Sequence, residues 1–533
     1  MTNTPDVTLS NCDREPIHQL GRIQAFGALI AVNSDWFVAH RSSNLEAIFG
    51  EGRSIEIGAP LSKMVAPAAM ELLRSAAATL TIPDQVERLF GVSLFGTEAL
   101  FDCALHSSGA NTIIEIEPHA AGDLNRQLAM LRPIMSRLEK QTDVQSLADE
   151  AARQLRHTLQ IDRVMVYRFR EDLSGEVIAE AAREDLEKFR GLRYPKSDIP
   201  NQARALYVRN RFRIIADVEA EPVPIEPGIS LDGEPLDLSM SALRAVSPIH
   251  IEYLHNMGVG ASLSISIIVG GKLWGLFACH HYGPKLLPYT QRTAAELFSE
   301  LFSLVLDRTL SRQVADRREM GRSIHTRLMR DVAAGTPLSA SLPMIEPVIQ
   351  QIIPHDGVSI FVEDIYDSRG SAPNEEEFRT IVPGLNAAAT SRLLASDEIA
   401  ARMPQAKRFA DRAAGALVIP VSRTPRDYLI LWRKPLTQTV TWAGNPEKPV
   451  ETGPNGDRLT PRKSFEAWRE TVDGRAEKWS EAELDIAEGL RITLLEIILR
   501  LTDEAVAERA KAQQQQELLI AELNHRVRNI LNL

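Results

Sequence analysis

The stretch Tyr-Pro-Lys-Ser-Asp-Ile-Pro-Asn-Gln-Ala-Arg-Ala-Leu-Tyr-Val-Arg-Asn-Arg-Phe-Arg, residues 194–213, places an aspartate between two prolines and ends in an arginine-rich segment. Pro195 and Pro200 restrict their own φ angles and those of the preceding residues, so Asp198 is predicted to lie on a stiff turn. The arginines that follow alternate with Ala, Leu and Tyr at helical spacing. This pattern indicates one wall of a pocket for an anionic organic ligand, although a surface loop followed by a charged helix has the same composition.

The overall composition restricts the class of protein. A chain of 533 residues is expected to form three or four domains at ~150 residues each. The formal net charge of -11 argues against nucleic acid as a principal partner, since phosphate binding needs a basic face. No apolar run approaches the ~20 residues of a membrane span, and no secretory signal is visible at the N-terminus. We therefore expect a cytoplasmic protein without a membrane partner.

The three cysteines, Cys12, Cys103 and Cys279, are too few and too scattered for a disulfide framework or a zinc cluster, and no metal site is predicted. Cys12 lies in a polar N-terminal segment, six residues before His18. An accessible thiol in such an arm is either incidental or an attachment point.

Strand and helix patterns predict an α+β fold with three sensor-type domains, each an antiparallel sheet with flanking helices, joined by long helices. Residues 123–159 carry leucines at spacings of three and four, which predicts one domain-connecting helix. Gly270-Gly271 between two apolar runs predicts a hairpin. The expected parts are an N-terminal arm (1–20), three domains (21–120, 125–310 and 311–505), and a helical end (506–533).

The third domain contains an unusual excursion, residues 437–478, which has its own tryptophans and motifs and is long for a loop. After it, Ser480-Glu-Ala-Glu483 has the form of a capping box that begins a helix. Leucines and isoleucines then recur at coiled-coil spacing to the end of the chain, which predicts a helix that associates with another.

Several polar residues of the second domain lie on elements that can line one pocket. His250 follows Ser247-Pro-Ile, and His280 ends an apolar strand; each alone is usually a structural residue. Together the set can neutralise acidic groups, hydrogen-bond a carbonyl and accept protons from a cationic heteroaromatic ligand. The set comprises Tyr167, Asp198, Tyr207, Arg213, Arg244, His250, Ser262, Ser264, Ser266 and His280.

At this point the motifs resemble those of a known family. Ser10-Asn-Cys-Asp-Arg-Glu-Pro-Ile-His18, Pro195-Lys-Ser-Asp-Ile-Pro200, Ser247-Pro-Ile-His250, Cys279-His-His281, Trp442-Ala-Gly-Asn-Pro446 and Pro461-Arg-Lys-Ser-Phe465 occur in this order. The chain thereby resembles a bacteriophytochrome photosensory region over essentially its whole length. The resemblance implies PAS, GAF and PHY domains at 21–120, 125–310 and 311–505, with the excursion 437–478 as the tongue of the PHY domain.

The resemblance also implies a cofactor, biliverdin IXα, a linear tetrapyrrole bound covalently as a thioether between Cys12 and the ring A vinyl group. Arg213 and Arg244, with Ser262 and Ser264, would bind its two propionates. Asp198 and His250 would lie near the pyrrole nitrogens, and His280 would hydrogen-bond the ring D carbonyl. The remaining residues expected around the chromophore are Met165, Tyr167, Tyr194, Ile199, Tyr207 and Tyr253.

The resemblance to the family also implies a signalling mechanism. Arg462 of the tongue would pair with Asp198 in one state, with Ser464 and Trp442 as further tongue residues. Light would isomerise the bridge to ring D, break this contact and refold the tongue between hairpin and helix, which is the logic of a two-state switch. The long helices imply a parallel homodimer.

Residues 522–529, Glu-Leu-Asn-His-Arg-Val-Arg-Asn, resemble the phosphoacceptor box of HWE-type histidine kinases, with His525 as the phosphorylated residue. A response regulator is then the expected partner of the full-length kinase. No Gly-rich nucleotide-binding region follows, so we expect no kinase activity from this chain alone.

The chain departs from the family pattern at two places, one beside Asp198 and one in the N-terminal threading segment. Lys196 replaces a common Ala, and Ile23-Gln-Ala-Phe-Gly27 lacks a common Pro-His pair. Two other functions remain possible on the same modules. A small-molecule or haem sensor predicts that Cys12 is dispensable, and an enzyme predicts turnover, for which no nucleophile–base pair is visible.

Overall fold

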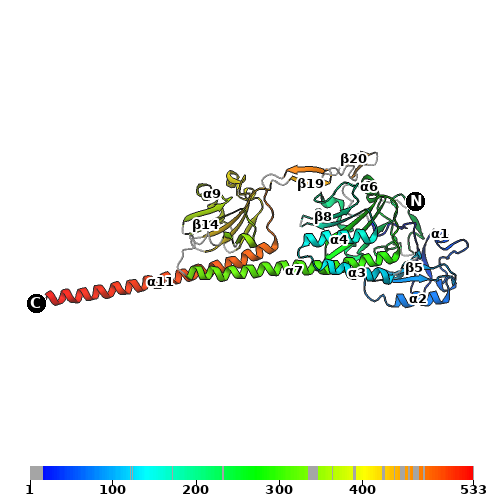
Figure 1. Ribbon diagram of the computed structural model, residues 1–533, viewed down its shortest axis with the longest axis horizontal. Coiled ribbons are helices and arrows are strands. Elements are labelled where there is room, and N and C mark those ends of the chain that lie inside the picture. The colour runs from blue at the N-terminus through cyan, green and yellow to red at the C-terminus, as the bar shows by residue number, and fades with distance from the viewer. Residues whose placement is uncertain are drawn as a thin grey trace. The chain divides into compact units, whose positions relative to one another are not determined.

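The computed structural model describes residues 16–120, 122, 124–170, 172–230, 233–333, 346–347, 349–362, 364–387, 392–422, 427–436, 439–443, 450–453, 456–459, 467–471 and 475–531. The chain forms two compact units. The first contains residues 1–310 and 440–470, and the second contains residues 311–439 and 471–533. Figure 1 shows the ribbon, in which α7 and α11 are the long helices.

The N-terminal part of the first unit is a seven-stranded sheet in the order β1-β11-β3-β2-β6-β5-β4. Its buried core lies between the sheet and the helices α1 and α2, and includes Ile30, Phe49, Leu73 and Ile114. The elements are β1 (Arg22–Ile23), β2 (Ala28–Val32), β3 (Val38–Ser42), α1 (Leu45–Phe49), α2 (Pro67–Ala78), β4 (Val86–Val92), β5 (Phe101–Ser108), β6 (Asn111–Pro118) and β11 (Val223–Glu226).

Strand β11 belongs to this sheet although the sequence pattern did not predict it as a strand. The pattern predicts only a loop around it, because its prolines and acidic residues are unusual in strands. In the structure, β11 pairs with both β1 and β3, with Arg22 opposite Pro224 and Ile225 opposite Ser42. A segment about 200 residues away in sequence thus covers a sheet edge whose backbone groups would otherwise lack partners.

The second sheet has the order β10-β12-β13-β7-β8-β9-β19-β22. Its strands are antiparallel from β10 to β9, whereas β19 pairs parallel with β9, with Trp442 opposite Arg193. The strands are β7 (Arg163–Phe169), β8 (Gly175–Ala182), β9 (Arg193–Tyr194), β10 (Phe212–Ile215), β12 (Ala261–Val269), β13 (Lys272–His281), β19 (Thr439–Ala443) and β22 (Ala467–Thr471). The helices of this region are α3 (Leu124–Leu138), α4 (Val144–Leu159), α5 (Asn201–Arg209), α6 (Pro248–Asn256) and α7 (Tyr289–Ala333).

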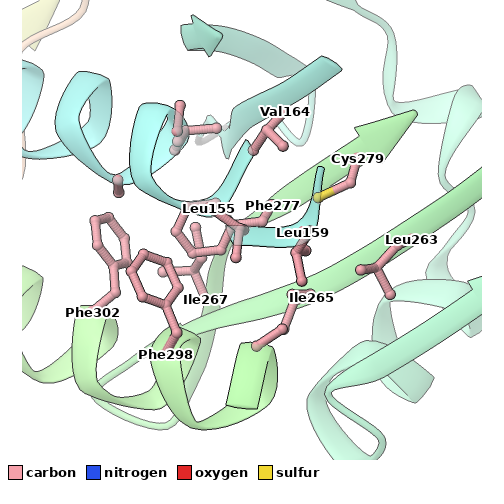
Figure 2. Packing of buried hydrophobic residues seen from close by; sticks show 14 of the residues in the cluster. Leu155, Leu159, Val164, Leu263, Ile265, Ile267, Phe277, Cys279, Phe298 and Phe302 are labelled. Atoms are coloured by element: carbon pink, nitrogen blue, oxygen red, sulfur yellow. The ribbon is translucent and has the colours of Figure 1, made fainter. Parts of the chain in front are cut away.

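The predicted hairpin is confirmed, with β12 and β13 joined by Gly270 and Gly271 at φ values of +56° and +75°. Positive φ at two successive turn positions is the geometry that glycine allows. Phe277 of β13 contacts Phe298 and Phe302 of α7 at centroid distances of 5.6 and 4.9 Å. Figure 2 shows these rings with Leu155 and Leu159 of α4 beside them, and Cys279 within the same core.

The prediction of one connecting helix over 123–159 is wrong. Two helices, α3 and α4, occupy this stretch, and both contribute buried leucines to the core of the second sheet. The break follows from Asp143, whose side chain caps α4 by accepting a hydrogen bond from the Ser146 N–H at 2.8 Å. A cap of this kind begins a new helix in spite of a continuous apolar pattern.

The second unit is built on a five-stranded sheet in the order β15-β14-β18-β17-β16. The capping box before α11 is confirmed, because the Ser480 N–H donates to Glu483 Oε2 at 2.8 Å and the Glu483 N–H donates to Ser480 Oγ at 3.3 Å. The elements are β14 (Gly357–Val362), β15 (Ile365–Gly370), α9 (Glu375–Ala387), β16 (Leu394–Ser396), α10 (Ile399–Arg402), β17 (Gly415–Pro420), β18 (Tyr428–Arg433) and α11 (Glu481–Leu531).

The excursion 437–478 is described only in part. It contains β19 and β22, which join the second sheet, and a hairpin of β20 (Val450–Gly453) and β21 (Gly456–Leu459). Among the helices that the structure describes, none is both long and apolar enough to cross a lipid bilayer.

Candidate functional site

The aspartate between the two prolines lies on a short 3₁₀ turn, Lys196–Asp198, that leads into α5. The Asp198 N–H donates to the Pro195 carbonyl at 3.0 Å. Arg204 Nε donates to the Ile199 carbonyl at 2.7 Å, which ties the end of the turn to the first turns of α5. The stiff turn expected from the sequence is therefore present.

This turn forms one wall of a cavity of about 150 Å³. The other walls come from α5, β10 and the segment 244–253. Seven residues of the sequence-predicted set line it: Asp198, Ile199, Tyr207, Arg213, Arg244, His250 and Tyr253.

Two arginines give the cavity its electrostatic character. Arg213 Nη2 donates to the Ala245 carbonyl at 2.9 Å, and Arg244 Nη1 donates to the Ile17 carbonyl at 2.8 Å. Arg213 Nη1 and Arg244 Nε are buried and have no hydrogen-bond partner among the residues that the structure describes. Buried charged donors left in this state are costly, so the two side chains fit an anionic ligand.

The pKa values of both arginines reflect the same situation. Burial lowers the pKa of Arg244 to about 10. Burial, and then the charge of Arg244, lower the pKa of Arg213 well below its usual value. An anion between the two guanidinium groups would reverse both effects, because an opposite charge favours the ionised form.

The other arginines of the opening stretch do not line this cavity. Arg209 forms an ion pair with Asp84, and Arg211 forms one with Glu300, at 2.7 and 2.8 Å. The interpretation of the whole arginine-rich segment as a pocket wall is thus wrong for these two residues. On α5 and the turn after it, helical geometry points successive arginines in different directions.

The two histidines are kept neutral by burial. Burial, reinforced by the charge of Arg213, lowers the pKa of His250 to about 4. Burial, together with the charges of Arg163 and His250, lowers the pKa of His280 to about 3. His280 Nδ1 is buried without a hydrogen-bond partner among the described residues. Neutral imidazoles of this kind can donate or accept one hydrogen bond at each nitrogen.

His280 does not line the 150 Å³ cavity itself, and neither do Ser262 and Ser264. The strand register places them close to Arg213, which does line the cavity. Ser264 of β12 lies opposite Arg213 of β10, and Ser262 of β12 lies opposite His280 of β13. The third serine, Ser266, has a different role, because its Oγ donates to the Tyr207 carbonyl at 2.6 Å.

An aromatic cluster adjoins the cavity. Met165, Tyr167 and Tyr194 are buried, and the rings of the two tyrosines lie 5.7 Å apart. Ile199, Tyr207 and Tyr253, which line the cavity, pack against this cluster. The structure therefore brings together six residues that the family resemblance implies around the chromophore, although they lie on elements far apart in the chain.

Some residues of the predicted site cannot be compared with the structure. Cys12, Arg462 and Ser464 lie outside the described residues, and of Trp442 only the strand backbone is described. His525 is exposed on α11. Sequence reasoning missed Ile17 and Ala245, whose contributions are backbone carbonyls, and a carbonyl carries no signal in residue type.

A second cavity of about 750 Å³ lies between the two sheets of the first unit. Its charged side chains largely satisfy one another: Arg209 with Asp84, Arg211 with Glu300, and Arg88 with Glu296. Side chains in complete ion pairs have little need of a charged ligand, whereas the smaller cavity holds guanidinium nitrogens that lack a partner in the part of the chain the structure describes. The smaller cavity is therefore the stronger candidate.

Comparison with known families matches three successive regions of the chain. The model described as PAS fold matches residues 12–119, the GAF domain model matches 143–306, and the model described as phytochrome region matches 321–503. The candidate site lies within the second of these regions.

Among curated relatives, a bacteriophytochrome of Pseudomonas aeruginosa is 38% identical over 100% of this chain and 71% of its own length. A bacteriophytochrome of Xanthomonas campestris is 33% identical over 98% of this chain and 82% of its own length. Cyanobacterial phytochrome B of Nostoc is 35% identical over 93% of this chain and 67% of its own length.

Two solved structures have the same fold. The bacteriophytochrome of R. palustris superposes with a TM-score of 0.80 at 32% identity, covering 92% of this chain and 99% of that one. The Stigmatella aurantiaca phytochrome photosensory core module has a TM-score of 0.76 at 35% identity, covering 93% and 99%. With three matching domains in order and relatives along the whole chain, this protein belongs to the bacteriophytochromes, the red/far-red photoreceptors that carry a bilin chromophore.

Proposed function

We propose that the bilin of this photoreceptor is biliverdin IXα, attached covalently to Cys12. The other two thiols argue for this choice. Cys103 and Cys279 are fully buried, and burial raises the pKa of each thiol. Because the thiolate is the reactive form, both are inert toward addition to a vinyl group, and Cys12 is the remaining candidate.

The observation that carries this proposal is the pair of arginines in the cavity, each with a buried guanidinium nitrogen that has no partner among the described residues. Biliverdin has two propionates, and planar guanidinium groups bind carboxylates through paired hydrogen bonds. Arg213 and Arg244 would hold the propionates, with Ser262 and Ser264 on the adjoining strand. The cavity alone is smaller than the ~300–1,000 Å³ typical of organic ligands, so the tetrapyrrole would extend beyond it, toward the aromatic cluster.

In this arrangement Asp198 and His250 would face the pyrrole nitrogens. His280 would donate to the ring D carbonyl from its neutral imidazole. Met165, Tyr167, Tyr194, Ile199, Tyr207 and Tyr253 would surround the chromophore. When bound, the bilin supplies light absorption and isomerisation about the bridge to ring D.

The proposed signal leaves the site through the tongue, residues 437–478. Arg462 would pair with Asp198 in one state only, with Ser464 and Trp442 contributing to the tongue, and its refolding would move the long helices. The protein would act as a parallel homodimer, and His525 would receive the phosphoryl group in the full-length kinase, which would pass it to a response regulator.

The first test adds biliverdin to apo-protein and records spectra after dark incubation and after red or far-red light. A photoreversible band is expected. A haem Soret band with haem, and no photoreversible band with biliverdin, would favour a haem sensor instead.

Two variants test the assigned roles. Cys12→Ser should abolish the zinc-fluorescent adduct on a denaturing gel, whereas a persisting adduct would point to another cysteine. Asp198→Ala should retain pigment attachment but lose most photoconversion. Normal photoconversion of Asp198→Ala would refute the proposed role of the aspartate.

A further inference from the structure

A line of buried and partly buried polar contacts joins the PAS sheet to the segment that carries Arg244. Ser108 Oγ donates to the Asp237 carbonyl at 2.8 Å. His106 Nε2 and Ser241 Oγ lie 3.0 Å apart, and His106 is buried. The last contact of the line joins Glu115 of β6 to Ala242 and Leu243, the two residues that precede Arg244 in the chain.

Glu115 binds two consecutive backbone N–H groups with one carboxylate. The Ala242 N–H donates to Oε2 at 3.0 Å, and the Leu243 N–H donates to Oε1 at 2.7 Å. Glu115 is only 3% exposed. A carboxylate that engages two successive peptides fixes their orientation, and with it the direction in which the next residue, Arg244, leaves the backbone.

The same segment is held from its other side by the N-terminal segment of the chain. The Gln24 N–H donates to the Leu243 carbonyl at 2.7 Å, and the Ala245 N–H donates to the Arg22 carbonyl at 3.0 Å. A Cβ on Gly27 would approach the Leu243 side chain to 2.8 Å, which shows how closely the backbone packs here. Leu243 therefore has both its N–H and its C=O engaged, one by Glu115 and one by Gln24.

Glu115 also acts on the cavity through its charge. Its negative charge raises the pKa of Arg213 and of Arg244, against the larger lowering caused by burial. It thus favours the ionised form of both arginines, although Glu115 itself does not line the 150 Å³ cavity. The other charged groups that act on Glu115 are Glu117 and Arg292, which pair with each other.

We propose that Glu115 is a positioning residue of the chromophore site. It orients Arg244, and its negative charge helps to keep Arg213 and Arg244 positively charged before the propionates bind. This rests on the proposed function, in which Arg213 and Arg244 bind the bilin propionates. It gives the PAS domain an indirect part in chromophore binding, through a residue that does not line the 150 Å³ cavity.

The proposal predicts that recognition of the propionates depends on pH. Burial raises the pKa of Glu115 to about 7, the two backbone N–H groups and Arg292 lower it, and the nearby Glu117 raises it. Glu115 also lines the 750 Å³ cavity. As the pH falls through about 7, the carboxylate takes up a proton and loses its charge and one of its acceptor sites. His250 and His280, with pKa values near 4 and 3, remain neutral over this range.

The experiment compares the rate of assembly with biliverdin and with its dimethyl ester, which lacks the carboxylates. In the unaltered protein the acid should assemble faster than the ester. Glu115→Gln should reduce this preference, the ratio of the two assembly rates, about tenfold, the change that about 1.4 kcal/mol produces. Arg244→Gln should reduce it at least as much, with Arg213 accounting for what remains. Ser108→Ala, which alters the same line of contacts away from Arg244, should leave the preference unchanged.

The outcomes separate the two proposals. If Arg244→Gln keeps the full preference for the acid, the propionate role of Arg244 is wrong. If Arg244→Gln lowers the preference but Glu115→Gln keeps it in full, the positioning role of Glu115 is wrong.

A second measurement needs no variant and therefore does not depend on folding of Glu115→Gln. The preference of the unaltered protein for the acid should decline as the pH is lowered from 8.5 to 6 in steps of about half a unit, with a midpoint near the pKa of Glu115. A preference that stays constant over this range would overturn the proposal, since a merely structural contact predicts no such midpoint. Where Glu115→Gln folds, its preference should be constant with pH.

Discussion

At the scale of single residues, the capacity of the cavity to bind an anion depends on which arginines already have a partner. Arg209, Arg211 and Arg213 lie within five positions of one another, yet two of them form ion pairs. Arg213 instead keeps a buried guanidinium nitrogen with no partner among the residues described. The residue types are identical, so composition cannot distinguish them. The local backbone does: Arg209 ends α5, Arg211 lies between α5 and β10, and Arg213 lies within β10, so the three side chains start from different backbone geometries.

We therefore predict opposite outcomes for two substitutions in one short stretch. Arg213→Gln should weaken biliverdin binding about 10- to 100-fold, since a charge-assisted hydrogen bond contributes ~1.5–3 kcal/mol. Arg209→Gln is the matched control and should leave binding unchanged, because its partner is Asp84. Titration of apo-protein with biliverdin, followed by absorbance, measures both. Equal losses in the two variants would contradict this account of the cavity.

A second prediction concerns pH and the buried His280. Burial first, and then the charges of Arg163 and His250, depress its folded-state pKa to about 3, below the usual value near 6.5. A proton then favours the unfolded chain, so the stabilisation is fully present above pH ~6.5 and is lost as the pH falls toward the folded-state pKa. The slope for one such histidine is up to about 1.4 kcal/mol per pH unit.

Urea unfolding of apo-protein between pH 7 and 5 should show this slope, and His280→Gln should reduce it. His157→Gln changes an exposed histidine and should not. An unchanged slope in His280→Gln would show that the imidazole is not neutral in the folded protein.

At the scale of elements, caps decide where helices begin. Asp143 divides a continuous apolar pattern into α3 and α4, and the reciprocal contacts of Ser480 and Glu483 begin α11. The Ser480–Glu483 motif could be predicted from the sequence because the two capping residues stand at a fixed spacing. The Asp143 cap could not, because its single capping residue stands within a pattern that also suits one long helix.

The α11 cap leads to a prediction about stability. Glu483 is buried and pairs with Arg433 as well as with Ser480, so the start of α11 is attached to β18. Ser480→Ala should lower the free energy of unfolding of this unit by about 1 kcal/mol. Chemical denaturation monitored by circular dichroism measures the change. Ser480→Asp retains a capping oxygen and should restore most of the loss; no difference between the two variants would argue against the cap.

At the scale of the whole molecule, exposed hydrophobic side chains on α11 indicate where two copies of the chain could associate. Leu519, Leu523 and Val527 are 63, 59 and 50% exposed, at intervals of four residues along the helix. Large apolar side chains in such a row favour association with a second helix. They support the proposed homodimer.

Replacing two of these residues should weaken that dimer. Leu523→Arg with Val527→Arg should shift the protein toward monomer, because two buried charges oppose each other across a symmetric interface. Gln514→Arg adds one charge at an exposed polar position and serves as the control. Sedimentation velocity at several concentrations distinguishes the species. A double variant that sediments as the unaltered protein would place the interface elsewhere.

The sequence by itself determined the three domains, the glycine hairpin, the turn of Asp198 and seven of the residues that line the cavity. These depend on local backbone preferences, on periodicity and on short motifs, all of which are written within a few neighbouring residues. Only the tertiary structure decided that β11 completes the PAS sheet, that Arg209 and Arg211 belong to ion pairs rather than the cavity, and that Glu115 holds the peptides before Arg244. The physical reason is the same in each case: hydrogen-bond and charge partners more than 80 residues apart are chosen by three-dimensional packing, for which spacing along the chain carries no signal.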